Sequence, residues 1–103
     1  MSAFLANDDA AYAAQTVSYT GTAGTTGTFQ AGANAVLVFC TTAAYVKVGV
    51  GVTATTASTP IPANTPIIMK VPPNTSGAPW RVSAIQIASG GNVYAKPGAL
   101  VDN

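Results

Sequence analysis

Residues Tyr45–Ala63 read YVKVGVGVTATTASTPIPA, and the alternation in this stretch decides the fold class. Successive side chains of a strand point to opposite faces, so every second residue shares a face. One face is apolar and consists of Val46, Val48, Val50 and Val52. The other face is nearly bare and consists of Tyr45, Lys47, Gly49 and Gly51. The pattern predicts a β-strand whose bare face is covered by other protein.

The chain beyond residue 14 is predicted to be β throughout. Short segments rich in β-branched and aromatic residues are separated by turns of Gly, Pro, Asn and Thr. Besides the strand that begins near Tyr45, the predicted strands are Gln15–Tyr19, Asn34–Cys40, Ile67–Val71, Trp80–Ala88 and Val93–Lys96. No helix-length segment lies between them, which excludes an alternating β–α fold. We therefore expect an all-β fold, an antiparallel β-sandwich of jelly-roll type.

Two details of the strands are also predicted. The short break at Thr41–Ala43 predicts a hairpin between the strands on either side of it. In Trp80–Ala88 the apolar residues change parity partway along the segment, which predicts a bulge near Ser83 or Ala84.

The two ends of the chain are expected to lie outside the sheets. Residues 1–14 are predicted to form an N-terminal arm, in which NDDAAYAAQ is long enough for a short helix that is marginal on its own. Residues 15–103 form the predicted sandwich domain. Pro97 and Gly98 are expected to end the last strand and to leave Ala99–Asn103 as a tail.

The composition excludes several classes of protein. The chain has 103 residues, of which 49% are hydrophobic and 7% charged, with a net charge of +1. Disorder needs high charge and low hydrophobicity, and nucleic-acid binding needs clustered cations, so neither is expected. The longest apolar run, Ala35–Cys40, is too short to span a membrane. The first residues lack the basic and apolar regions of a signal peptide, which predicts a protein made in the cytoplasm.

Groups that perform acid–base or metal chemistry are scarce. The chain has no His and no Glu, and its acids are Asp8, Asp9 and Asp102, close to the ends. A general acid or base needs a formed site, and a metal needs several convergent ligands. A Ser–Lys dyad is the remaining formal alternative, but we expect no enzyme, no cofactor and no metal. Cys40 ends an apolar strand and is predicted to be a buried, inert thiol.

Two segments support a resemblance to a known group of proteins. They read YVKVGVGVTATTASTPIPANTPIIMKVPPNTS and WRVSAIQIASGGNVYA, between Tyr45 and Ala95. Their order of V-K-x-G, PIPA, VPP and GGxVY resembles small structural proteins of tailed-bacteriophage virions. The resemblance implies a virion component, and several such proteins are capsid decoration or cement proteins with jelly-roll folds. It implies the major capsid protein as partner and the capsid surface as location, after synthesis in the host cytoplasm.

Candidate partner contacts follow from residue type. They are the residues of the bare face together with strand cations and the tryptophan: Tyr45, Lys47, Gly49, Gly51, Lys70, Trp80 and Arg81. Solvated cations that protect sheet edges are the plainer interpretation of the lysines. Because Asn34–Cys40 is apolar on both faces, we expect a dimer or trimer. The alternative function is a tail or fibre module that binds host glycan through Trp80 and the tyrosines, or that joins tail proteins. A position in the core or in an interface is the plainer interpretation of Trp80, since no acid is available beside it to bind sugar hydroxyls.

Overall fold

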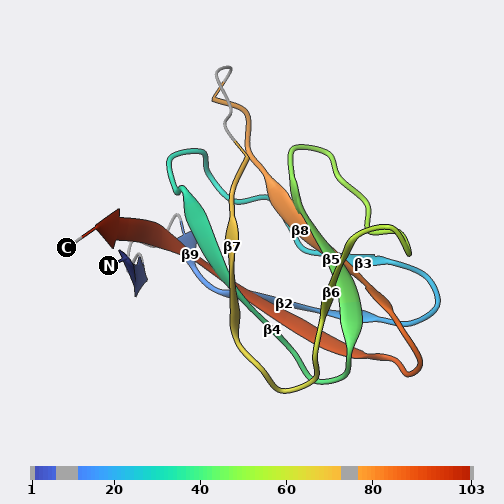
Figure 1. The fold of residues 1–103 in the computed structure, drawn as a ribbon. Coiled ribbons are helices and arrows are strands. Elements are labelled where there is room, and N and C mark those ends of the chain that lie inside the picture. The colour runs from blue at the N-terminus through green and yellow to red at the C-terminus, as the bar shows by residue number, and fades with distance from the viewer. Residues whose placement is uncertain (1, 7–11, 73–76, 103) are drawn as a thin grey trace.

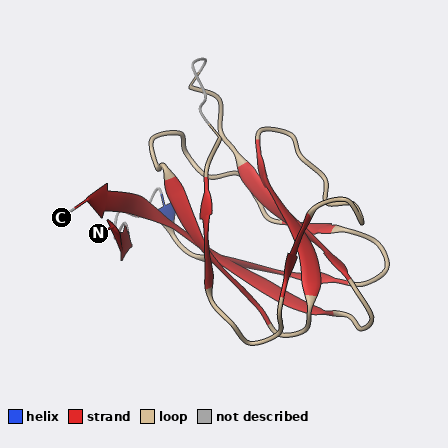
Figure 2. Cartoon of the chain, viewed as in Figure 1, coloured by secondary structure: helices blue, strands red, loops and turns tan. Residues whose placement is uncertain are grey.

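The protein is an all-β chain with two antiparallel sheets (Figures 1 and 2). The computed structural model describes residues 2–6, 12–72 and 77–102. The strands of this part of the chain are β1 (Ser2–Ala6), β2 (Gln15–Tyr19), β3 (Gly24–Thr25), β4 (Ala35–Cys40), β5 (Ala44–Gly49), β6 (Thr59–Ile61), β7 (Ile67–Lys70), β8 (Arg81–Gln86) and β9 (Gly91–Asp102). The expectation of an all-β, two-sheet fold is confirmed.

The strands pair in a nested order. One sheet, called sheet A here, has the order β1-β9-β4-β7, and β2 also pairs with β9; the other, sheet B, has the order β3-β8-β5-β6. β2 pairs with residues 91–95 of β9 and β1 with residues 98–102, so β1 and β2 lie end to end along one edge of β9. Partners are β2 with β9, β3 with β8, β4 with β7 and β5 with β6, as in one long hairpin folded over itself.

The core lies between the two sheets. Its largest members are aromatic and branched side chains that are almost wholly buried: Tyr19, Phe29, Ile61, Trp80 and the inward-facing valines of β4, β5, β8 and β9. The alternation of β4 and β5 explains why these strands form: Val36 and Val38 face Val46 and Val48 across the interior. Each fully buried side chain of this size contributes roughly 1.5–3 kcal/mol relative to exposure.

The predicted hairpin at Thr41–Ala43 is wrong. β4 and β5 lie in different sheets, and this segment crosses from one sheet to the other. β7 and β9 already occupy both edges of β4, so β5 packs against it face to face instead. The crossing is held by hydrogen bonds: the Thr41 N–H donates to the carbonyl of Asn92 (3.0 Å), and the Tyr19 hydroxyl donates to the carbonyl of Thr42 (2.6 Å).

The predicted bulge in β8 is also wrong. β8 pairs with β5 without interruption along its whole length. The extra residue lies in the neighbouring segment, because Thr25 pairs with Ser83 while Phe29 pairs with Trp80. The segment advances four residues, from Thr25 to Phe29, over the length in which β8 and the residue before it advance three, from Ser83 to Trp80. Ile85 stays on the face opposite to Trp80, half-buried on the outside of sheet B.

The last strand is longer than predicted. β9 continues through Pro97 and Gly98 to Asp102, so the expected end at Pro97 and the expected tail are both wrong. Pro97 lies opposite Val36 on one edge, but on the other edge it falls between the residues that pair with β2 and those that pair with β1. A proline cannot donate to the ladder, and a position with an open edge tolerates it.

The N-terminal arm is partly a strand. Ser2–Ala6 forms β1, which sequence reasoning did not predict and which runs beside the C-terminal end of β9 (Figure 1). Most of the predicted helix lies outside the described residues. Tyr12, within the predicted arm, is joined to the sandwich: its hydroxyl donates to the carbonyl of Ala31 (2.9 Å), and its own carbonyl accepts from Lys96 Nζ (3.1 Å).

The proline-rich segment after β5 contains β6, which was not among the predicted strands. β6 places Pro60 opposite Tyr45 at the edge of sheet B, where a strand proline is tolerated. β6 pairs with Ala44–Val46 of β5 and with no later residue of that strand. The segment before β6 instead folds back over the outer face of sheet B.

Candidate interaction surfaces

The chain's own loop covers the glycine side of β5. Ala54 is buried in this loop, and its N–H donates to the hydroxyl of Ser83 on β8 (2.9 Å). Arg81 Nε donates to the carbonyl of Val52 (2.9 Å). A Cβ placed on Gly49 would come within 2.9 Å of a methyl carbon of Val52. The bare face predicted from sequence is therefore covered by the chain itself at Gly49, whereas Lys47 and Gly51 stay exposed; Gly49 and Arg81 contact the loop.

Tyr45 and Gly51, also predicted as contacts, have separate roles in the structure. Tyr45 is half-buried on the outer face of sheet B, paired with Ile85 on one side and Pro60 on the other. Gly51 is exposed, with a φ of 65°, and an added Cβ would meet nothing within 4 Å. Its backbone conformation, which side chains of L-residues disfavour, explains the glycine at this turn.

Trp80 lies in the core. Its side chain is 2% exposed, and its ring centroid lies 4.7 Å from that of Phe29. The indole Nε1 is buried and has no hydrogen-bond partner among the described residues. Trp80 also lines a hollow of ≈ 330 Å³ beside residues 31–34 and 70–72. In this position the indole has no exposed face that a glycan ring or a partner could cover.

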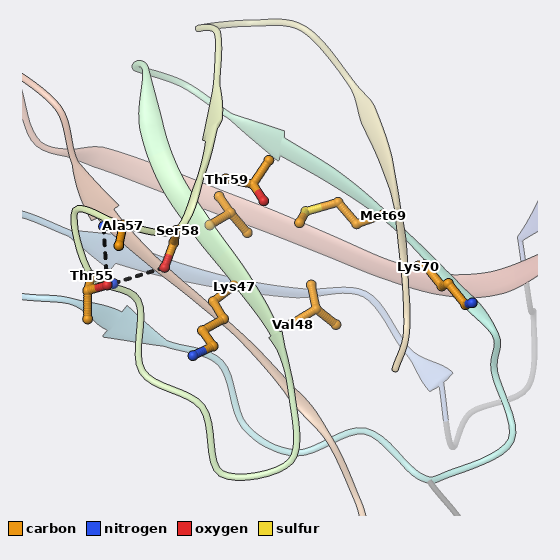
Figure 3. Close-up of a pocket in the computed structure, with 9 residues that line it drawn as sticks. Lys47, Val48, Thr55, Ala57, Ser58, Thr59, Met69 and Lys70 are labelled. Atoms are coloured by element: carbon orange, nitrogen blue, oxygen red, sulfur yellow. Dashed lines mark hydrogen bonds between the residues drawn. The ribbon is translucent and has the colours of Figure 1, made fainter. Parts of the chain in front are cut away.

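The structure brings two of the predicted lysines to one hollow. Lys47 of β5 and Lys70 of β7 are both exposed, and both line a hollow of ≈ 350 Å³ (Figure 3). The other lining residues are Val46, Val48, Thr55, Ala57, Ser58, Thr59 and Met69. In Figure 3 the two lysines lie on either side of Val48, and their ammonium ends point away from each other. Both lysines were predicted contacts from the sequence, but only the fold brings them to the same hollow.

A second surface lies on the outer face of sheet A. We call it the apolar row and define it as Leu37, Phe39, Ile68 and Tyr94. Leu37 pairs with Ile68, and Phe39 pairs with Tyr94, with ring centroids 6.0 Å apart. Ile68 is 44% exposed and Tyr94 43%. The two-sided apolar pattern of Asn34–Cys40 signalled this surface, but Ile68 and Tyr94 were not among the predicted contacts.

The described residues offer little for covalent or metal chemistry. They contain no group of three or more His, Cys, Asp or Glu that could hold a metal ion. Cys40 is fully buried, and burial raises the pKa of its thiol to about 11, although a hydrogen bond with Tyr19 acts in the opposite direction. The thiolate is the reactive form of cysteine, so this thiol is a poor nucleophile at neutral pH. The placement of Cys40 in the core is confirmed.

Comparison with protein-family models, with curated proteins and with solved structures found no match. Within residues 2–6, 12–72 and 77–102, no helix is long and apolar enough to cross a membrane. The features of the molecule that bear on function are therefore the fold, the apolar row and the hollow between Lys47 and Lys70.

Proposed function

We propose that the protein is a non-enzymatic structural protein of a tailed-bacteriophage virion, made in the host cytoplasm. In this proposal it decorates the outer surface of the major capsid lattice and stabilises the head as a cement protein. The apolar row is the observation that most supports an assembly role. Four large side chains lie together on the outside of a sheet, in a chain that is only 7% charged. Contiguous exposed apolar surface of this kind marks protein–protein contact.

The strand order supports a jelly roll as the finer description of the sandwich. The nested partners β2–β9, β3–β8, β4–β7 and β5–β6 are those of an eight-strand hairpin rolled into two sheets. Jelly rolls occur in viral capsid proteins, but also in lectins and cupins. The fold is therefore compatible with a virion role, and the resemblance of Tyr45–Ala95 to phage structural proteins favours it over the others.

The proposal assigns the apolar row to contact between copies of this chain. A second copy presents the same row, so a closed two-fold or three-fold arrangement buries it on every copy. On an icosahedral shell such an oligomer contacts several capsid subunits at once. Linked contacts of this kind give firm attachment even where each one is weak.

The tail or fibre alternative has less support. A glycan platform needs an exposed aromatic ring. Of the residues proposed for it, Trp80 is buried, and Tyr94, which is 43% exposed, is a ring that remains available. A role in joining tail proteins would use the same apolar row and differs only in the partner.

Reconstitution with capsids tests the proposal. Heads purified from the phage that encodes the chain, and stripped of it, are mixed with the protein and sedimented. We expect the protein to sediment with the heads at a fixed ratio and to raise their resistance to heat and low salt. Failure to sediment with heads, or sedimentation with tails alone, would contradict the cement function.

A matched pair of variants tests self-association. Ile68 belongs to the apolar row, whereas Ile87 is equally exposed, at 44%, next to β8 of sheet B. Ile68→Lys should convert the oligomer to a monomer in analytical ultracentrifugation at micromolar concentration, and Ile87→Lys should not. A wild-type monomer, or an equal effect of both variants, would remove the apolar row as the oligomer interface.

A further inference from the structure

The hollow between Lys47 and Lys70 lies beside two strand edges that have no partner in the described part of the chain. β6 pairs with β5 only as far as Val46, so the edge of β5 from Lys47 onward is unpaired on this side. β7 is the last strand of sheet A and pairs only with β4. Open edges present backbone N–H and C=O groups that an added strand can satisfy.

The side-chain polar groups that line the hollow can all donate hydrogen bonds: two ammonium groups and the hydroxyls of Thr55, Ser58 and Thr59. Lys47 and Lys70 supply ammonium groups. The hydroxyl oxygen of Thr55 accepts from the Ala57 N–H (3.3 Å), and that of Ser58 accepts from the Thr55 N–H (3.1 Å). Each hydroxyl therefore keeps its own proton to donate, since it donates to no described residue (Figure 3).

Among the described residues, no carboxylate lines the hollow to pair with the two ammonium groups. Among residues 2–6, 12–72 and 77–102 the one acid is Asp102, in the strand end that pairs with Ser2. Two ammonium groups with no described carboxylate beside them fit an anionic ligand, and carboxylates form strong charge-assisted hydrogen bonds with such groups.

The shape of the lining indicates an extended chain as the ligand. Val46, Val48 and Met69 supply apolar lining to the hollow, and Val48 lies between the two lysines (Figure 3). β7 itself alternates, with Met69 directed inward and Lys70 exposed. A strand added to its edge would continue that alternation, with apolar side chains against Met69 and acidic side chains beside Lys70. A small anion would use the lysines but neither the apolar wall nor the open edges.

We propose that this hollow binds an extended segment of a partner protein in which carboxylate and apolar side chains alternate, added as a strand to the edge of β7. That the segment belongs to the capsid protein rests on the proposed function; the binding chemistry does not.

The test uses fluorescence anisotropy with a labelled peptide of alternating aspartate and valine. We expect saturable binding that weakens as salt is added. The combined Lys47→Gln and Lys70→Gln variant should weaken binding by about two- to thirtyfold, the range of two exposed ion pairs. Lys96→Gln is the matched control, since it removes a lysine of sheet A that lies outside the hollow, and it should leave the affinity unchanged.

Further probes separate the possible ligands. A peptide with asparagine in place of aspartate should bind more weakly, because its side chains are neutral. Two further peptides are N-methylated at the odd or at the even positions. One of the two should bind more weakly than the other, because strand pairing with β7 uses alternate N–H groups of the peptide. Equal binding of the asparagine peptide, equal loss in Lys96→Gln, or displacement by inorganic phosphate or an acidic oligosaccharide at the peptide's own concentration would overturn the inference.

The peptide assay contains no capsids, so it fails or succeeds separately from the proposed function. Peptide binding without attachment to heads would keep this site and reject the cement role. Attachment to heads that the double lysine variant leaves intact, together with no peptide binding, would keep the cement role and reject this site.

Discussion

Phe29 and Trp80 are joined both through their backbones and through their rings. The Phe29 N–H donates to the Trp80 carbonyl (2.7 Å), and the Trp80 N–H donates to the Phe29 carbonyl (3.1 Å). Their ring centroids lie 4.7 Å apart at an interplanar angle of 33°. This pair ties the irregular segment after β3 to the start of β8, so the segment closes one end of the core.

Replacing Trp80 should therefore be among the most destabilising single changes in the chain. Trp80→Ala should lower the free energy of unfolding by about 3–5 kcal/mol, as loss of a large buried aromatic does. Trp80→Phe should cost clearly less, because it keeps an aromatic ring against Phe29 and the indole Nε1 has no hydrogen bond to lose. Urea denaturation followed by circular dichroism measures both, and equal losses in the two variants would contradict this account.

Cys40 should make stability depend on pH in the alkaline range. Burial raises the pKa of its thiol from 9.0 to about 11, so the folded state holds the proton more tightly than the unfolded state. The stability that this thiol contributes is complete below pH 9 and is lost as the pH rises toward 11. Cys40→Ala removes this thiol, so the free energy of unfolding of the variant should fall less steeply over this range than that of the wild type.

The same residue should react slowly with thiol reagents in the native protein. Cys40→Ser should lower the free energy of unfolding by about 1–3 kcal/mol, because a hydroxyl would be buried there without its preferred partners. Labelling as fast as in the urea-unfolded chain would show that the thiol is accessible and would contradict its burial.

Gly51 should tolerate asparagine better than alanine. Its φ of 65° lies in the left-handed region, and the space around its Cα is open, so the cost of a side chain is conformational. Gly51→Ala should lower the free energy of unfolding by about 1–2 kcal/mol, and Gly51→Asn by less, since asparagine adopts this conformation more readily. Urea denaturation with Trp80 fluorescence measures both, and a neutral alanine variant would contradict the assignment.

The sandwich should survive the loss of β1. Residues 2–6 pair only with β9, and none of them belongs to the core cluster. A chain that lacks residues 1–6 should keep the emission maximum of Trp80 and unfold cooperatively. A chain that lacks residues 1–14 should be less stable still, because it also loses the bonds of Tyr12 to Ala31 and Lys96. Unfolding of the shorter deletion would show that β1 belongs to the core.

Local patterns were sufficient to predict most strands. Gln15–Tyr19 is β2 as predicted, and the strands near Asn34, Tyr45, Ile67 and Trp80 differ from β4, β5, β7 and β8 only at their ends. Alternation with a period of two, β-branched residues and turn residues at the strand ends are local properties, so a sequence states them directly. The burial of Cys40 followed from the same alternation.

Strand pairing could not be predicted in this way. The sequence around Thr41–Ala43 is short enough for a hairpin, and only the occupation of both edges of β4 by β7 and β9 makes it a crossing between sheets. The end of β9 was misjudged for a similar reason. Pro97 and Gly98 are poor strand residues, and the strand continues because β1, almost the whole chain away in sequence, pairs with it.

For the candidate sites, too, some features follow from local sequence and others from the pairing of distant strands. The sequence by itself determined that the chain is all-β, that Asn34–Cys40 is apolar on both faces, and that its few cations lie in strands. Only the tertiary structure decided that the chain's own loop covers Gly49, that Trp80 is buried, and that Lys47 and Lys70 meet at one hollow. The physical reason is that alternation places a residue on a face of its strand, whereas what covers that face depends on segments brought there by long-range pairing.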